Sequence, residues 1–163
     1  MSKVSTILYA SDLGEGSRPA FRVAIEQAKA HRARVVYLHV VAPLGDMAEE
    51  AISDFLPESA NKSHLQRLFE ERKSVIKNRL NRFHDDELTE DDVELVERPE
   101  VEVVQGKAYR CILDAAQKFD ADLIVMGDRA SSSLSRIFLG STAQKVIHQS
   151  VRPVLIVPLF ASA

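Results

Sequence analysis

The stretch Ala121-Asp122-Leu123-Ile124-Val125-Met126-Gly127 is the segment of this sequence that says most about its fold. The consecutive apolar residues Leu123–Met126 lack the alternation of a strand that keeps one face in water. Such a run is typical of a parallel sheet that helices cover on both faces. Residues 121–127 therefore predict a buried strand in the middle of a sheet, and the final glycine permits a tight exit into a loop.

Similar runs recur along the chain and alternate with segments of helical periodicity. They predict four more strands, over residues 6–10, 34–41, 101–105 and 154–157. Apolar residues at helical spacing predict four helices, which begin after a capping Ser17, at about Ser63, at Ala108, and after a capping Ser141 or Thr142. This alternation predicts one α/β domain over residues 1–163, with a single doubly wound, five-stranded parallel sheet and helices on both faces. Residues 43–61 are irregular, with room for a short helix near 47–55.

Composition excludes several classes of protein. A chain of 163 residues with 45% apolar residues suits one folded domain and is too apolar for a disordered chain. The net charge of −3 provides no global positive field for nucleic acid. The apolar runs are too short for a signal peptide or a spanning helix, so no membrane insertion is expected. The lone Cys111 forbids an intrachain disulfide and fits a reducing compartment, so we expect a cytoplasmic protein.

Charge is distributed unevenly in the middle of the chain. Basic residues crowd positions 62–82, whereas residues 85–102 hold ten of the 24 acidic residues. The interpretation we favour is a solvated helix face balanced by the acidic segment beside it. A basic docking face is the alternative.

The loops after the first and fourth predicted strands are where a ligand is expected. In doubly wound sheets, ligands bind at the carboxyl ends of the strands where the strand order reverses. Asp12 follows the first of these strands, and Gly140-Ser141-Thr142 opens the last helix. The free amides at a helix N-terminus suit a phosphate. The alternative is that Gly140 only ends a loop and Ser141 only caps a helix. Neither a nucleophile elbow nor a histidine pair with metal-ligand spacing is present.

Several of these motifs in combination resemble the universal stress protein family. They are the strand ending in Asp12, the segment Leu38-His39-Val40, the stretch 121–127, and the closing runs 139–143 and 151–157. The resemblance covers nearly the whole chain except residues 43–61. It implies a five-stranded parallel sheet in the order 3-2-1-4-5.

The resemblance also implies an ATP site. ATP-binding members carry a spaced motif of three glycines followed by serine or threonine, and here Gly127, Ala130, Gly140 and Ser141 stand at its positions. Asp12 and Val40 would then lie against the adenosine, with Ala10 and Met126 lining the cleft. The residues around the ribose and phosphates would be Gly127, Arg129, Ala130, Gly140, Ser141 and Thr142. A divalent cation such as Mg²⁺ could accompany the triphosphate.

Three functions fit these features. The first is a stress-response regulatory protein that binds an adenine nucleotide, ATP, at the carboxyl ends of the first and fourth strands. The second is a dimeric interaction module of the same fold that binds no nucleotide. The third and least favoured is a slow ATPase, because no general base for water is evident. An apolar edge strand over Val154–Val157 predicts a homodimer, in line with the resemblance. No protein partner, stress signal or catalytic residue is predicted.

Overall fold

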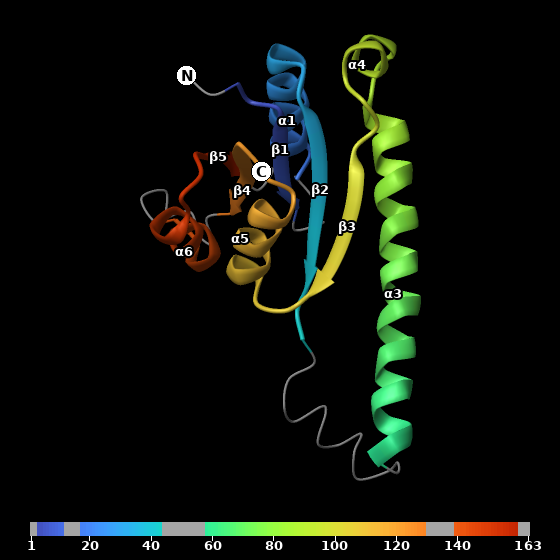
Figure 1. Ribbon diagram of the computed structural model, residues 1–163. Helices are drawn as coiled ribbons and strands as arrows, with labels where there is room; N and C mark the ends of the chain where they lie inside the picture. Colours follow the sequence, from blue (N-terminus) through green and yellow to red (C-terminus); the bar gives the residue numbers. More distant parts are fainter. Residues whose placement is uncertain (1–2, 12–16, 44–57, 130–138, 160–163) are drawn as a thin grey trace.

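The computed structural model describes residues 3–11, 17–43, 58–129 and 139–159. Figure 1 shows a single sheet with the long helix α3 running beside one of its edges. The sheet has five parallel strands in the order β3-β2-β1-β4-β5, which confirms the predicted fold class. Their bounds are Thr6–Ser11 (β1), Arg34–Val41 (β2), Glu100–Gln105 (β3), Leu123–Arg129 (β4) and Val154–Leu159 (β5).

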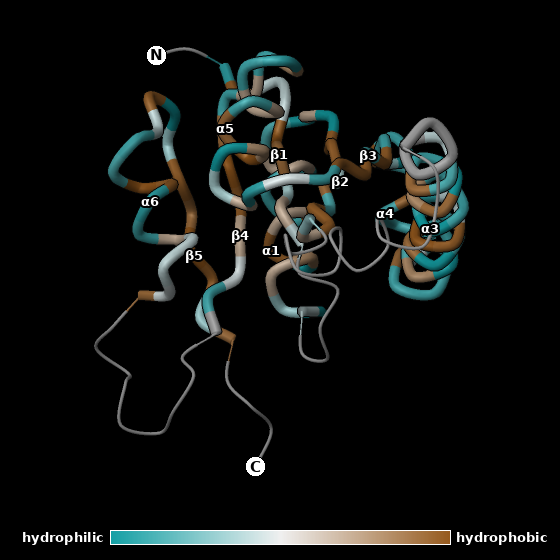
Figure 2. Tube along the Cα trace, turned by 90° about the horizontal axis from the view of Figure 1, so that it is seen from below, coloured by the Kyte–Doolittle hydropathy of each residue, from teal (hydrophilic) through white to brown (hydrophobic). Residues whose placement is uncertain are grey.

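The sheet divides two hydrophobic cores, because neighbouring residues of each central strand point to opposite faces. Tyr9 and Val125 pack with helix α1 (Arg18–His31) and with helix α3 (Glu58–Glu87). Leu8 and Ile124 pack on the other face, with helices α5 (Ala108–Lys118) and α6 (Ser141–Gln149). Figure 2 shows α1 and α5 on opposite sides of the strands. Burial on both faces is the physical reason why the strand 123–126 reads as one continuous apolar run.

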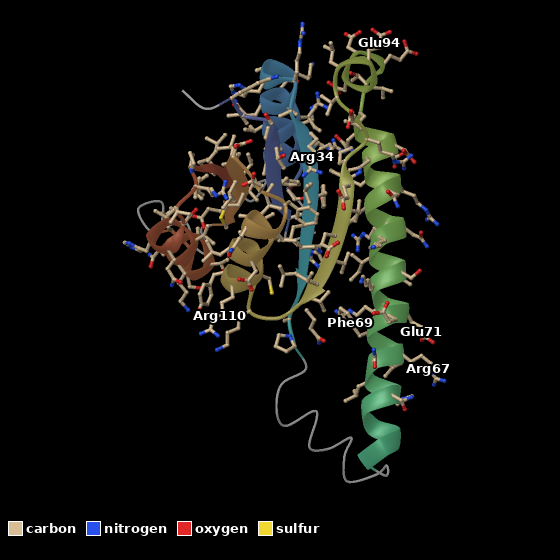
Figure 3. The ribbon with its side chains drawn as sticks, in the orientation of Figure 1. Arg34, Arg67, Phe69, Glu71, Glu94 and Arg110 are labelled. Carbon is tan, nitrogen blue, oxygen red and sulfur yellow. The ribbon has the colours of Figure 1, made fainter. Side chains whose placement is uncertain are left out.

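The segment between β2 and β3 departs most from the sequence-based expectation. Helix α3 spans 58–87 and so begins before the predicted start at about Ser63, and a further short helix, α4 (Glu90–Leu95), was not predicted at all. The expected helix near 47–55 lies outside the described residues. Figure 3 shows Arg67 and Glu71 on the part of α3 remote from α4, where they form an exposed i,i+4 ion pair. Among the described residues, no helix combines the length and apolarity that crossing a membrane requires.

Two predicted boundaries differ in the structure. Strand β4 begins at Leu123 rather than at Ala121, and the Asp122 carboxylate before it accepts the amides of Ser5 and Thr6, at 2.8 and 3.0 Å. The N-cap of α6 is Gly140, so the prediction of a Ser141 or Thr142 cap was wrong. Ser17 does hold the N-cap position of α1, but its side chain makes no capping hydrogen bond.

A buried carboxylate joins α4 to α1 at the amino end of the sheet. Asp92 is 1% exposed and accepts hydrogen bonds from Arg22 at 2.9 Å and Lys29 at 3.1 Å. It also accepts the backbone amide of Thr89, whose hydroxyl in turn accepts the Asp92 amide, which completes a capping box. Burial alone would raise the pKa of Asp92, but the hydrogen bonds from Arg22, Thr89 and Lys29 hold that pKa well below its usual range.

Candidate functional site

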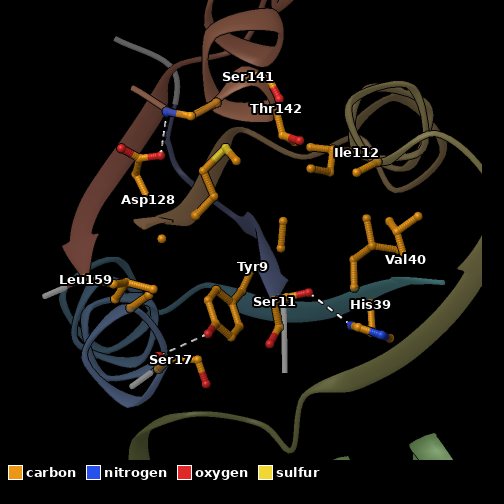
Figure 4. Close-up of a pocket in the computed structure, with 18 residues that line it drawn as sticks. Tyr9, Ser11, Ser17, His39, Val40, Ile112, Asp128, Ser141, Thr142 and Leu159 are labelled. Atoms are coloured by element: carbon orange, nitrogen blue, oxygen red, sulfur yellow. Dashed lines mark hydrogen bonds between the residues drawn. The ribbon is translucent and has the colours of Figure 1, made fainter. Parts of the chain in front are cut away.

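A cleft of about 390 Å³ opens at the carboxyl ends of β1 and β4. Connections from β1 lead to β2 and β3 on one side, whereas β4 and β5 lie on the other side. The cleft therefore lies where the strand order reverses, which is the usual ligand position in a doubly wound sheet. Figure 4 shows Ser141, Thr142 and Asp128 on one side of it and His39 and Val40 on another.

The structure brings together most of the residues that were predicted from the sequence to form the ligand site. Seven of them line the cleft, from four separate segments of the chain: Ala10, Val40, Met126, Gly127, Gly140, Ser141 and Thr142. Asp12 and Ala130 lie outside the described residues. Arg129 is the last residue of β4, and its side chain is not among those described.

Apolar side chains make one part of the cleft suitable for a flat, uncharged ring. Ala10 and Met126 are register partners on β1 and β4, so they lie side by side on the cleft floor. Val40 from β2 and Ile112 from α5 complete this apolar part. Small-molecule sites combine such surfaces with a few polar groups that fix orientation.

Polar contacts hold the mouth of the cleft between β1 and β2. The Nδ1 atom of His39 donates to the carbonyl oxygen of Ser11 at 3.1 Å, which fixes the ring's tautomer and orientation. The Tyr37 hydroxyl and the Ser11 hydroxyl are hydrogen-bonded at 3.0 Å. The Tyr9 hydroxyl donates to the carbonyl oxygen of Ser17, directly before α1, at 3.3 Å. These hydrogen bonds join β1 to β2 and to the start of α1, and so hold this side of the cleft in place.

Several lining residues were not predicted as site residues, and Asp128 is the acid among them. Its Oδ1 accepts the backbone amide of Gly140 at 2.9 Å, directly before α6 (Figure 4). A β-carbon on Gly140 would lie 2.9 Å from that same oxygen, closer than real contacts of this kind. A larger residue at position 140 would therefore force the Asp128 side chain to shift. The spacing of Met126 and Asp128 could have revealed this residue, since positions i and i+2 of a strand share a face.

The other glycine of the motif also has a packing role. A β-carbon on Gly127 would overlap the side chain of Leu159, the last residue of β5. Leu159 is buried in the core and lines the cleft as well. Gly127 thus lets the end of β5 close one side of the cleft.

The charge of the lining is unusual for a phosphate site. Among the described residues that line the cleft, Asp128 is the one acid, and lysine and arginine are absent. The described residues also contain no group of three potential metal ligands. Within the described lining, an anionic group would therefore meet no lysine or arginine side chain.

Fold and cleft together define an α/β protein with a ligand site at the switch point of a doubly wound sheet. The model of the universal stress protein family matches residues 3–158, so the chain belongs to that family, as the sequence motifs indicated. A universal stress protein of Thermus aquaticus is 35% identical over 152 residues, which are 93% of this chain and 97% of that protein.

Solved structures agree on the fold. The universal stress protein UspA from Lactobacillus plantarum superposes with a TM-score of 0.68 at 21% identity, covering 96% of this chain and 99% of that one. A universal stress protein in complex with cAMP superposes with a TM-score of 0.54 at 18% identity, covering 98% of this chain and 100% of that one. At these identities the likeness concerns the fold alone.

Proposed function

We propose that this universal stress protein is a regulatory protein that binds an adenine nucleotide in the cleft between β1, β4 and α6. The observation that carries the proposal is the convergence of seven predicted site residues, from four segments, on one cleft with an apolar floor. The base and ribose would lie against Ala10, Val40 and Met126. Ser141 and Thr142 would contact the ribose or a phosphate at the start of α6.

The motif positions imply further contacts that complete this proposal. Asp12 would accept hydrogen bonds from the ribose or the base, and Arg129 and Ala130 would border the phosphates. ATP with a divalent cation such as Mg²⁺ is the ligand that the motif spacing implies. Support that the fold accommodates an adenine nucleotide comes from the neighbour whose structure contains cAMP. The single cysteine of the chain supports a reducing, cytoplasmic location.

Titration calorimetry with adenosine, AMP and ATP tests the proposal. We expect at least one of them to bind the parent protein, and Ala10→Met to abolish binding because the larger side chain fills the cleft floor. Val151→Met is the matched control, since Val151 is exposed outside the cleft, and it should bind as the parent does. Circular dichroism checks that both variants fold. Failure of all three compounds to bind the parent would instead favour the interaction module without nucleotide.

We also propose a homodimer formed through β5. This strand is an edge of the sheet, and its residues Val154–Val157 are only partly buried in the single chain. Pro158, within the strand, lacks an amide hydrogen and is tolerated at an edge. Light scattering should find a dimer at micromolar concentration, and Ile156→Pro should shift it to monomer. A monomeric parent would refute this assembly.

A further inference from the structure

The carboxylate of Asp128 lies at the amino end of α6. Its Oδ1 receives the Gly140 amide at 2.9 Å, and Gly140 is the N-cap residue of that helix. The amino end of a helix carries a partial positive charge that favours one anionic group close to it. In this protein a side chain from β4 already provides that anion.

The rest of the described lining offers no charge to offset a second anion. Its polar residues are neutral hydroxyls and the ring of His39, and the acid Asp128 faces no lysine or arginine there. The ion pairs of the described residues all lie elsewhere, for instance Lys118 with Glu102 on α5 and β3. A triphosphate would bring several negative charges next to the Asp128 carboxylate, in a cleft partly shielded from water, where repulsion is stronger than in bulk solvent.

We infer that Asp128 is a specificity residue that makes the cleft select adenosine and AMP over ATP. This inference rests on the proposed function and narrows its ligand class. The apolar floor formed by Ala10, Val40 and Met126 would hold the adenosine part of each ligand equally well. Discrimination would come from the phosphate end, where each added phosphate approaches Asp128.

A purely structural role for Asp128, as a cap that fixes α6, is the competing explanation. Asp128→Asn separates the two roles, because the asparagine oxygen can still accept the Gly140 amide while the negative charge is gone. A matched control is Asp91→Asn, which removes the same charge from an exposed site on α4, away from the cleft lining. Melting temperatures of both variants show whether the fold is retained.

The experiment is calorimetric titration of parent, Asp128→Asn and Asp91→Asn with adenosine, AMP and ATP, in EDTA. We expect the parent to bind AMP about tenfold or more tightly than ATP. In Asp128→Asn the ratio should fall to about threefold or less through a gain for ATP, with adenosine affinity unchanged. Asp91→Asn should keep the parent's ratio. Equal or tighter binding of ATP by the parent, or an unchanged ratio in Asp128→Asn, would overturn the inference.

Inorganic tripolyphosphate separates this inference from the proposed function. If no adenine compound binds the parent, the proposed function fails on that result alone. The exclusion of phosphate groups by the Asp128 charge is then judged separately, by tripolyphosphate binding to the same proteins. A gain of binding in Asp128→Asn over the parent supports charge exclusion at α6, and the absence of a gain refutes it.

Discussion

Asp92 and Asp128 are the same chemical group in two opposite settings at the two ends of the sheet. Asp92 is buried, and two cationic side chains and a backbone amide donate to it. Asp128 lines an open cleft and, among the described residues, receives only the Gly140 amide. A carboxylate surrounded by donors contributes to stability, whereas one with spare acceptor capacity in a cleft is available to influence a ligand.

The largest effect is expected at Asp92. Asp92→Ala should lower the free energy of unfolding by about 3 kcal/mol or more, because it leaves Arg22 and Lys29 without their shared buried partner. Chemical denaturation measures this loss. Asp91→Ala, one residue earlier and exposed, is the control and should change stability by less than about 0.5 kcal/mol. If Asp92→Ala changed the free energy of unfolding only slightly, the idea that Asp92 stabilises the fold while Asp128 does not would be contradicted.

The pH dependence of the free energy of unfolding also tests the role of Asp92. The contribution of the buried His84 must first be distinguished from that of Asp92. His84 is fully buried, stacks on Phe21, and has no hydrogen-bond partner at either ring nitrogen in the described structure. Burial, with a smaller contribution from Arg98 and an opposing one from Asp85, lowers the pKa of His84 to about 4. The unfolded state therefore binds a proton at His84 more readily than the folded state does. The contribution of His84 to the free energy of unfolding is fully present above pH 6.5 and is lost as the pH falls toward 4.

We expect this loss to approach about 3 kcal/mol between pH 6.5 and 4, and His84→Phe to remove most of it. The lowered pKa of Asp92 has a different window: its contribution is present above its unfolded pKa of 3.8 and is lost only as pH falls below that. Denaturant midpoints measured from pH 7 to 3 on parent, His84→Phe and Asp92→Asn resolve the two windows. A pH dependence that persists unchanged in His84→Phe would contradict the assignment.

A smaller effect is expected from the contact between Asp128 and Gly140. Gly140→Ala in the parent should cost about 1 kcal/mol, because the β-carbon would crowd the Asp128 oxygen. In an Asp128→Ala background the same change should be neutral or stabilising by about 0.5 kcal/mol, since φ of −59° at this position suits alanine. A double-mutant cycle by thermal denaturation tests this reversal of sign. Additive effects would show that the two residues are not coupled.

The smallest effect concerns Mg²⁺. If the Asp128 charge opposes ATP, Mg²⁺ should raise ATP affinity about threefold more in the parent than in Asp128→Asn, because the cation screens a repulsion that the variant lacks. Calorimetry with and without Mg²⁺ measures the difference. AMP serves as the control ligand, and equal enhancement in both proteins would contradict the idea.

The central sheet could be predicted from the sequence because each strand and each helix is marked by the pattern of its own consecutive residues. Strands buried on both faces require runs such as Leu123–Met126, and the helices require apolar residues at their own period. The position of the cleft followed from topology, since parallel strands bring their carboxyl ends to one edge. Seven nominated residues therefore meet there although they lie far apart in the chain.

The missed features depend on partners distant in sequence. Helix α4 lies in a stretch so acidic that it suggests a solvated segment, yet Asp92 is buried there by Arg22 and Lys29 from α1. Asp128 appeared to be a loop residue because a polar end of a strand has no apolar pattern to mark it. The hydrogen bond between Asp128 and the Gly140 amide joins residues 12 positions apart in the sequence. It becomes evident only once the end of β4 and the start of α6 are placed side by side in the fold.

Helix α3 has a consequence for how the protein opens. Its 30 residues extend for about 45 Å, roughly twice the length of the six-residue strand β3 beside it. The first of its described side chains to pack against the core is Phe69, and Leu68 is 44% exposed. Leu80, in the second half of the helix, is fully buried in the core. Amide hydrogens around Leu68 should therefore exchange with deuterium before those around Leu80, so α3 should open near Leu68 while its contact with the sheet at Leu80 remains intact.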